Sequence, residues 1–134
     1  MTKEEWELVR RNVERGLGGK AYLRIDGYEI TLMMEPIDHY RNAIAVYVDG
    51  KIKGEWLLQK DELGKEICRR FFQPHTTTPS IAKGIKLSKK QKAELKEKYG
   101  YTYYEPWWTS FGRLKAHLVR NNKNITIIKK GQIL

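Results

Sequence analysis

The chain is poor in the residues that staple small secreted domains or bind metals. Cys68 is the single cysteine among 134 residues, so no internal disulfide can form. The three histidines, His39, His75 and His117, lie far apart in the sequence. Zinc sites use Cys and His ligands at short, regular spacings. The sequence therefore predicts no disulfide, no metal site and no cofactor, and its cysteine content favours a reducing, cytoplasmic setting.

Long apolar segments are also missing. No apolar run approaches the ~20 residues of a membrane span, and the charged start MTKEEWELVRR lacks the apolar segment of a secretory signal. The composition is 40% hydrophobic and 11% aromatic, which favours a folded chain over a disordered basic tail. We therefore expect one domain over residues 1–134 with no membrane partner.

Acidic residues are scarce in the second half of the chain. Residues 1–58 carry 9 Lys and Arg against 10 Asp and Glu, whereas residues 59–134 carry 17 against 6. The whole formal net charge of +10 therefore comes from residues 59–134. A neutral half joined to a strongly basic half predicts a positive face that binds a polyanionic partner.

The N-terminal residues predict a helix. Thr2 and Glu5 have the spacing of a capping box, in which each side chain accepts a hydrogen bond from the other residue's backbone. Apolar residues then recur on one helical face, and glycines at 16, 18 and 19 are expected to end the helix. The apolar face consists of Trp6, Val9, Val13 and Leu17.

Two Asp-Gly pairs predict two β-hairpins. Asp26-Gly27 lies between residues 20–25 and 28–35, and Asp49-Gly50 lies between residues 43–48 and 51–58. Asp-Gly supplies the positive φ angles of a type I′ turn, whose twist suits antiparallel strands. The neutral half is therefore expected to add a four-stranded antiparallel meander to the N-terminal helix.

Helical periodicity dominates the basic half. Leu63, Ile67 and Phe71 share a helical stripe that Pro74 ends, and a polar loop is expected over residues 75–80. A second capping box, Ser88 with Gln91, opens a helix that runs to residue 99. An aromatic stretch over 100–109, a helix over 110–121 and a strand over 125–128 follow. The predicted fold class is α+β, a four-stranded antiparallel meander with an N-terminal helix, basic C-terminal helices and the helices packed on one face.

The last helix is the clearest candidate for a binding surface. Its apolar face is formed by Phe111, Leu114 and Leu118. The opposite face carries Arg113, His117 and Arg120, with Lys115 beside them, and such a row of cations can contact phosphates. The alternative is the ordinary solvated face of an amphipathic helix.

Lysines and aromatic residues extend the candidate surface. Lysines at a helix N-terminus oppose the helix dipole, so phosphate contact is one explanation of the lysine cluster and solubility is the other. The aromatic residues at 101, 103 and 104, with the adjacent tryptophans, can stack on bases or pack a helix onto a sheet. We expect one tryptophan to be buried and the other partly exposed. The candidate binding residues are Lys83, Lys86, Lys89, Lys90, Lys92, Lys96, Trp107, Trp108, Arg113, Lys115, His117 and Arg120.

Catalytic patterns are weak. Cys68 lies on an apolar helical stripe, where a buried and inert thiol is expected. Glu94 and Lys96 have the Glu-x-Lys spacing of many nucleases but fall on a predicted helix. Glu29, Glu35 and Asp38 are the remaining carboxylates that could come together. The sequence therefore predicts a protein that is not an enzyme, with a nuclease or other hydrolase as an alternative.

Two resemblances add context. The order of helix, strands and basic helix, with Ser88-Lys89-Lys90-Gln91-Lys92, resembles a double-stranded-RNA-binding domain, although that family has no helix and loop between its strands and its basic helix. The segment from Tyr104 to Asn122 is similar to short proteins encoded by prophages and mobile elements of Gram-positive bacteria. That resemblance implies a bacterial cytoplasm and an inhibitor of host defence, including anti-CRISPR proteins.

These patterns favour a non-enzymatic protein that binds nucleic acid, or a nucleic-acid–protein complex, through its basic C-terminal half. An inhibitor of a host defence effector such as a CRISPR–Cas complex is one form of that function. A protein–protein interaction module, whose basic surface serves solubility, is the alternative from a different class.

Overall fold

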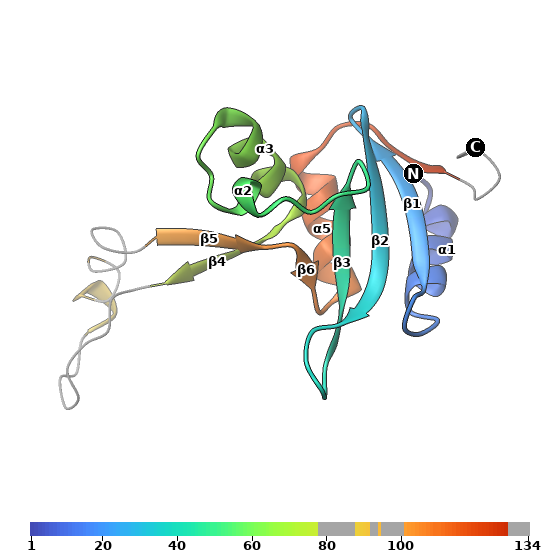
Figure 1. The fold of residues 1–134 in the computed structure, drawn as a ribbon, viewed down its shortest axis with the longest axis horizontal. Coiled ribbons are helices and arrows are strands. Elements are labelled where there is room, and N and C mark those ends of the chain that lie inside the picture. Colours follow the sequence, from blue (N-terminus) through green and yellow to red (C-terminus); the bar gives the residue numbers. More distant parts are fainter. Residues whose placement is uncertain (78–87, 92–93, 95–100, 129–134) are drawn as a thin grey trace.

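The computed structural model describes residues 1–77, 88–91, 94 and 101–128. Over these residues the chain forms an α+β structure with one five-stranded sheet and one two-stranded sheet (Figure 1). The helices are α1 (Lys3–Val13), α2 (Gly54–Leu57), α3 (Glu62–Phe71) and α5 (Phe111–Asn121). The strands are β1 (Lys20–Ile25), β2 (Tyr28–Pro36), β3 (Asn42–Val48), β4 (Gln73–Thr77), β5 (Tyr101–Glu105), β6 (Trp107–Trp108) and β7 (Ile125–Ile128).

The first predicted hairpin is confirmed. Asp26 and Gly27 have φ angles of 46° and 90°, as a type I′ turn requires, and Ile25 pairs with Tyr28 across the turn. The strand predicted over 125–128 is also confirmed, and it pairs with β1 at one edge of the sheet. The antiparallel sheet has the order β6-β3-β2-β1-β7.

The second Asp-Gly pair makes the expected turn, but the strand predicted after it is wrong. Asp49 and Gly50 have φ angles of 52° and 78°, and a single bridge joins Val48 to Lys51 before the chain leaves the sheet for α2. The edge of β3 is occupied by β6, a segment from much later in the chain. Ile44 and Ala45 pair there with the two tryptophans of β6. Tertiary pairing thus replaces the local hairpin partner.

Helix α1 confirms the capping box and most of the predicted apolar face. The backbone N–H of Thr2 donates to Glu5 Oε1 at 3.0 Å, and that of Glu5 donates to Thr2 Oγ1 at 3.1 Å. The first three members of the predicted apolar face are buried, but Leu17 is 62% exposed. The helix ends at Val13, so the chain has left the helical path before it reaches Leu17.

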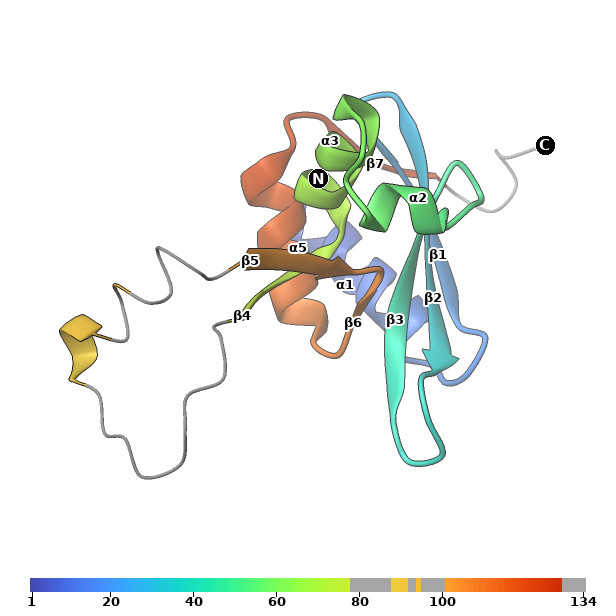
Figure 2. The ribbon, with the colours of Figure 1, turned by 60° about the vertical axis from the view of Figure 1, so that its left-hand side comes forward.

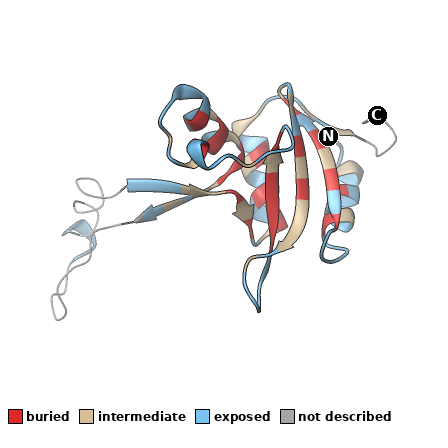
Figure 3. Ribbon diagram, viewed as in Figure 1, coloured by how far each residue is buried: buried red, intermediate tan, exposed pale blue. Residues whose placement is uncertain are grey.

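The core lies between the sheet and the helices α1, α3 and α5, which all lie on one side of the sheet (Figure 2). Alternate strand residues point into this layer. They include Leu23 and Ile25 of β1, Ile30 and Leu32 of β2, and Ile44, Val46 and Val48 of β3, which are buried. Figure 3 shows the buried positions along these strands. Among the described elements, no helix lies over the opposite face of the sheet, which we call the outer face.

Helix α3 confirms two members of its predicted stripe, Ile67 and Phe71, which are buried. Leu63 is exposed, which corrects the third member. Cys68 is buried, and its Sγ lies 3.1 Å from the carbonyl oxygen of Trp56. Burial raises the pKa of the Cys68 thiol to about 11. The expected buried thiol is therefore confirmed, and the thiolate is disfavoured at neutral pH.

Strands β4 and β5 form a two-stranded ribbon that projects from the rest of the molecule (Figure 1). The sequence predicts a polar loop over residues 75–80. This prediction is wrong for residues 75–77, which belong to β4 and pair with β5. Five residue pairs join the two strands, from Gln73 opposite Glu105 to Thr77 opposite Tyr101. The exposed distal part of the ribbon is visible in Figure 3.

No helix among the described residues is both long enough and apolar enough to cross a membrane.

Candidate nucleic-acid interface

The predicted lysine cluster lies mostly outside the described residues. Lys83, Lys86, Lys92 and Lys96 belong to that part of the chain. Lys89 and Lys90 are described, and both are exposed in a short helical segment. The Ser88 N–H donates to Gln91 Oε1 at 3.0 Å and the Gln91 N–H donates to Ser88 Oγ at 3.2 Å, which confirms the capping box.

Helix α5 confirms the predicted amphipathic helix. Ser110 is its N-cap, and Phe111, Leu114 and Leu118 are buried. Arg113 and Arg120 are exposed on the other side of the helix. Neither arginine has an ion pair with a carboxylate among residues 1–77, 88–91, 94 and 101–128. Both guanidinium groups are therefore available to an anionic ligand in this part of the molecule.

His117 does not belong to the exposed row, which corrects its prediction as a cation. Its ring is half-buried, with Nε2 2.9 Å from the carbonyl oxygen of Arg69 and Nδ1 3.2 Å from Asn121 Nδ2. This pattern suits a neutral ring whose Nε2–H donates and whose Nδ1 accepts. Burial, assisted by the charge of Arg120, lowers the pKa of His117. His117 therefore joins α5 to α3 as a neutral side chain.

Lys115 is also separated from the two exposed arginines. It is half-buried, and its Nζ lies 5.6 Å from the centroid of the Trp6 ring on α1. An ammonium group at that distance from an indole ring is stabilised by a cation–π interaction. The predicted row of four side chains is thus divided between the two flanks of α5.

The two tryptophans face opposite sides of the sheet. Trp108 is 4% exposed and its Nε1–H donates to the carbonyl oxygen of Phe71 at 3.1 Å. Trp107 is half-buried and pairs with Ala45 on the outer face. The predicted division into one buried and one partly exposed tryptophan is confirmed. Successive residues of a strand point to opposite faces, so β6 separates the two rings, and Trp107 does not share a surface with Arg113.

Arg69 is a cation that sequence reasoning missed. It is exposed on α3, its backbone carbonyl oxygen accepts the hydrogen bond from His117 of α5, and the residue lines a hollow with Glu62, Glu66 and Tyr104. Burial raises the pKa of Tyr104, and the nearby charge of Arg69 opposes that rise. Arg69 has no ion pair in the described residues. We call Arg69, Arg113 and Arg120 the arginine surface.

The neighbouring Arg70 has a structural task instead. Its guanidinium group lies 2.8 Å from Asp26 Oδ2 and 2.9 Å from Glu66 Oε1, and it donates to Asn122 Oδ1 at 3.1 Å. Hydrogen bonds from the backbone N–H groups of residues 123 and 124, with Arg70, hold the pKa of Asp26 below its usual value. This network joins α3, the first hairpin and the segment after α5. The carboxylates in it neutralise the charge of the Arg70 guanidinium group.

The ribbon presents an aromatic face. Tyr101 and Tyr103 are 65% and 41% exposed, and His75 stacks on Tyr103 with ring centroids 5.2 Å apart and planes 22° apart. Tyr104, on the other face of the ribbon, is half-buried against the core. The predicted aromatic stretch therefore divides into exposed and packed members. His75 was not predicted, because the pairing of β4 with β5 alone places it beside Tyr103.

The three carboxylates that could have formed a metal site are separate. Glu29 pairs with Arg24 at 3.2 Å, Asp38 pairs with Arg41 at 2.7 Å, and Glu35 accepts a hydrogen bond from Tyr47. Glu29 and Glu35 lie on the same strand but about 20 Å apart at the usual rise per residue. In the described part of the chain, no group of three His, Cys, Asp or Glu side chains is arranged to hold a metal ion.

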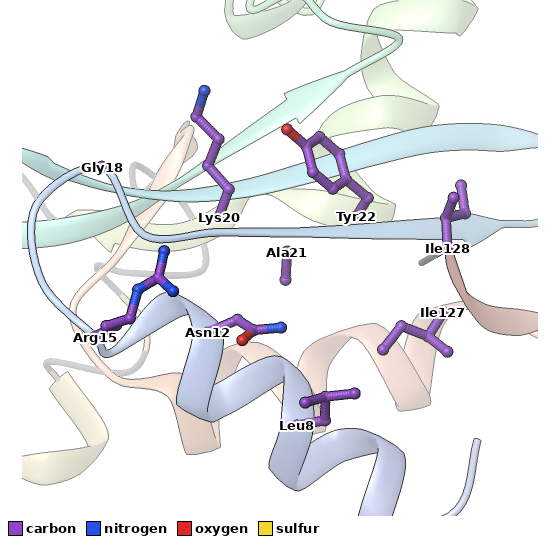
Figure 4. Close-up of a pocket in the computed structure, with 9 residues that line it drawn as sticks. All are labelled: Leu8, Asn12, Arg15, Gly18, Lys20, Ala21, Tyr22, Ile127 and Ile128. Carbon is purple, nitrogen blue, oxygen red and sulfur yellow. The ribbon is translucent and has the colours of Figure 1, made fainter. Parts of the chain in front are cut away.

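A hollow lies elsewhere, between α1 and the strands β1 and β7 (Figure 4). It measures about 520 Å³. Leu8, Ala21 and Ile127 give it apolar walls, and Asn12 and Arg15 supply polar groups from α1. Its lining includes no carboxylate, histidine or thiol, so the described side chains around it offer no group for acid–base chemistry near neutral pH.

The candidate interface therefore consists of the arginine surface, the aromatic face of the ribbon and the exposed Lys89 and Lys90. Helix α3 leads directly into β4, so the arginine surface and the base of the ribbon are adjacent in the chain. Comparison with protein-family models, curated proteins and solved structures finds no match for this chain.

Proposed function

We propose that this protein binds nucleic acid, free or within a nucleic-acid–protein complex, and that it acts by binding rather than by catalysis. The observation that carries the proposal is the ribbon. It projects from the body on the same side as α3 and α5 (Figure 2), exposes Tyr101 and Tyr103, and starts shortly after Arg69, which has no ion pair among the described residues.

The charge distribution supports this function. Residues 59–134 carry a large excess of cations over carboxylates. Lys and Arg side chains that neutralise phosphates release condensed counterions, which makes binding favourable and dependent on salt. Aromatic side chains and a projecting two-stranded ribbon are both used by proteins to contact bases. The described part of the basic half offers both groups side by side.

The test is the effect of charge reversal on affinity and on its salt dependence. Arg113→Glu with Arg120→Glu should weaken the binding of a labelled 20-nucleotide DNA or RNA and lower the slope of log K against log salt by about 2. Both side chains are exposed, so each substitution should change the free energy of unfolding by less than about 0.5 kcal/mol.

The matched control is Arg11→Glu with Arg15→Glu. These arginines are exposed in and just after α1, far from the ribbon (Figure 1). The control makes the same change in net charge and should leave the affinity nearer that of the unchanged protein. If both double variants lose the same amount of affinity, the loss is explained by net charge alone and not by a binding surface at Arg113 and Arg120. Unchanged affinity in the Arg113/Arg120 variant would overturn the proposed surface.

The proposed ligand includes nucleic acid that is bound within a nucleoprotein complex of host defence. The resemblance to prophage proteins that we expect from residues 104–122 leads us to include an inhibitor that contacts the guide RNA or target DNA on a CRISPR–Cas effector. Such an inhibitor should reduce DNA cleavage by a purified RNA-guided nuclease at stoichiometric concentrations. Full cleavage by a panel of such nucleases at a tenfold excess of the protein would oppose this extension.

The outer face of the sheet favours a second candidate function, protein–protein interaction. Tyr22, Met33, Tyr47 and Trp107 are all half-buried there and no described helix covers them. The charges of this face balance, since β1 contributes Lys20 and Arg24 and β2 contributes Glu29 and Glu35. A neutral aromatic face suits a protein partner better than a polyanion. Trp107→Ala should weaken the binding of such a partner. The affinity of the unchanged protein for that partner should depend little on salt concentration.

A further inference from the structure

We infer that the aromatic face of the ribbon binds unpaired bases, so that single-stranded nucleic acid is the preferred ligand. This inference rests on the proposed function and specifies its ligand. It depends on the placement of three rings, Tyr101, Tyr103 and His75, on one face of a two-stranded ribbon.

The register of the ribbon brings the three rings together. Tyr101 and Tyr103 are two residues apart on β5 and therefore point to the same face. Their ring centroids are 6.3 Å apart, close to the distance that two residues span along a strand. His75 lies directly opposite Tyr103 and stacks on it. The result is a short aromatic row along the ribbon, with Tyr101 as its most distal and most exposed ring.

The exposed rings lie together on one surface, and exposed apolar groups that adjoin one another can mark an interaction site. Aromatic side chains supply a large part of the buried apolar surface in cores and interfaces, yet Tyr101 has no described neighbour except Tyr103 in a ring contact. On the opposite face of the ribbon, the exposed residues are Pro74, Thr76 and Thr102, none of which is aromatic. The exposed aromatic residues are thus concentrated on one face, in the part of the ribbon that extends from the body, whereas Tyr104 on the other face is half-buried.

Unpaired bases match this surface better than a duplex. In a double helix the flat faces of the bases are covered by neighbouring base pairs, and only their edges are accessible in the grooves. A tyrosine ring offers a flat π face, which stacks on an exposed base whatever its sequence. Arg69 lies near Tyr104 at the base of the ribbon and offers a phosphate contact there, whereas Glu105 Oε2, 3.6 Å from His75 Nε2, places a carboxylate beside the proximal end of the aromatic row. The chemistry of the site is therefore stacking with phosphate contacts, and little base-specific hydrogen bonding is expected.

The experiment compares the affinities of the full chain for labelled single-stranded and duplex oligonucleotides of equal length, in both DNA and RNA, at one salt concentration. Tyr101→Ala and Tyr103→Ala should each weaken single-strand binding by about 5- to 100-fold and change duplex binding little. Tyr101→Phe and Tyr103→Phe keep the ring and should bind nearly as the unchanged protein does. Thr76→Ala with Thr102→Ala, on the opposite face, is the matched control.

The outcomes separate this inference from the proposed function. The inference is supported if the unchanged protein prefers single strands, the alanine variants lose this preference and the phenylalanine variants keep it. Equal or tighter binding of duplex, or alanine variants that bind single strands like the unchanged protein, overturns it while leaving nucleic-acid binding in place. Failure to bind any of the oligonucleotides overturns the proposed function, and the inference with it.

Discussion

At the scale of single residues, the last turn of α3 explains why two predicted binding residues, the half-buried His117 and the buried Trp108, pack against the body of the protein. The final carbonyl groups of a helix have no partner within it. Here the carbonyl oxygens of Arg69, Arg70 and Phe71 accept hydrogen bonds from His117, Asn122 and Trp108 respectively. The side chains of Trp108 in β6, His117 in α5 and Asn122 just after α5 therefore cap the C-terminus of α3.

His117 should make stability depend on pH. Burial depresses its pKa in the folded state, so the unfolded chain binds the proton more readily. The stabilising contribution is therefore fully present above the unfolded pKa of about 6.5. It is lost as the pH falls through 6.5 towards the lower pKa of the folded state.

The measurement is urea unfolding of the unchanged protein and of His117→Gln at pH 7.5 and 5.5. Glutamine can still donate to the Arg69 carbonyl but carries no titrating ring. The unchanged protein should lose more stability between the two pH values than the variant does. The same pH dependence in both proteins would show that His117 is not the group responsible.

Trp108 and Trp107 should differ sharply in their contribution to stability. Trp108→Ala removes a buried ring and leaves the Phe71 carbonyl without its donor, and we expect a loss of roughly 3–5 kcal/mol in the free energy of unfolding. Trp107→Ala, on the outer face, should cost about 1 kcal/mol. Chemical denaturation of both variants tests this difference, and equal losses would contradict the two environments assigned to the rings.

At the scale of elements, the edge of β3 shows how distant pairing overrides a local signal. Asp49-Gly50 turns the chain as a hairpin requires, but β6 supplies the neighbouring strand, and the backbone N–H of Val46 donates to the Pro106 carbonyl at 2.8 Å. The segment after the turn is then free to form α2, whose Trp56 is buried in the core. The same turn is compatible with either partner, so the choice depends on tertiary packing.

The junction between α1 and β1 depends on a glycine. A Cβ atom at Gly19 would lie 2.6 Å from the Asn12 carbonyl oxygen and 2.7 Å from that of Val13. Gly19→Ala should therefore force the end of α1 away from β1 and cost about 1–3 kcal/mol. Gly54→Ala at the start of α2 is the control, since nothing lies within 4 Å of its Cβ position. Thermal unfolding should show a lower midpoint for Gly19→Ala alone, and equal midpoints would contradict the close approach.

At the scale of the whole molecule, the described cations of the basic half do not form one continuous surface. Arg70 neutralises carboxylates inside the fold, Lys115 lies over Trp6, and His117 is neutral. The arginine surface and the exposed Lys89 and Lys90 keep their charge available in the described residues. Within the described part of the chain, we therefore expect electrostatic attraction to phosphate to act through these exposed groups.

We expect the protein to leave nucleic acid intact. Glu29, Glu35 and Asp38 each have a separate hydrogen-bonding or ion-pair partner and do not converge, whereas catalysis needs convergent groups at one site. Incubation of DNA and RNA with an excess of the protein, in Mg²⁺ or Mn²⁺, should give no cleavage products on a denaturing gel. Multiple turnovers that disappear on changing any of these three carboxylates would refute this expectation.

Local sequence signals determined much of the secondary structure. The capping box at Thr2, the type I′ turn at Asp26-Gly27, the strands on either side of it and helix α5 all depend on residues close together in the chain. Their geometry follows from backbone preferences and apolar periodicity, which are readable from the sequence. The burial of Cys68 and the opposite placement of the two tryptophans were predictable for the same reason.

Tertiary structure alone decided which strand completes the sheet and which basic residues remain free. Residues far apart in the chain pair β3 with β6, stack His75 on Tyr103 and join His117 to Arg69. Helical periodicity places His117 beside Arg113 and Arg120, but it carries no information on which neighbouring helix covers that flank. The free energy of those long-range contacts, set by burial and hydrogen-bond satisfaction, divides the predicted cationic row and creates the ribbon that the sequence did not reveal.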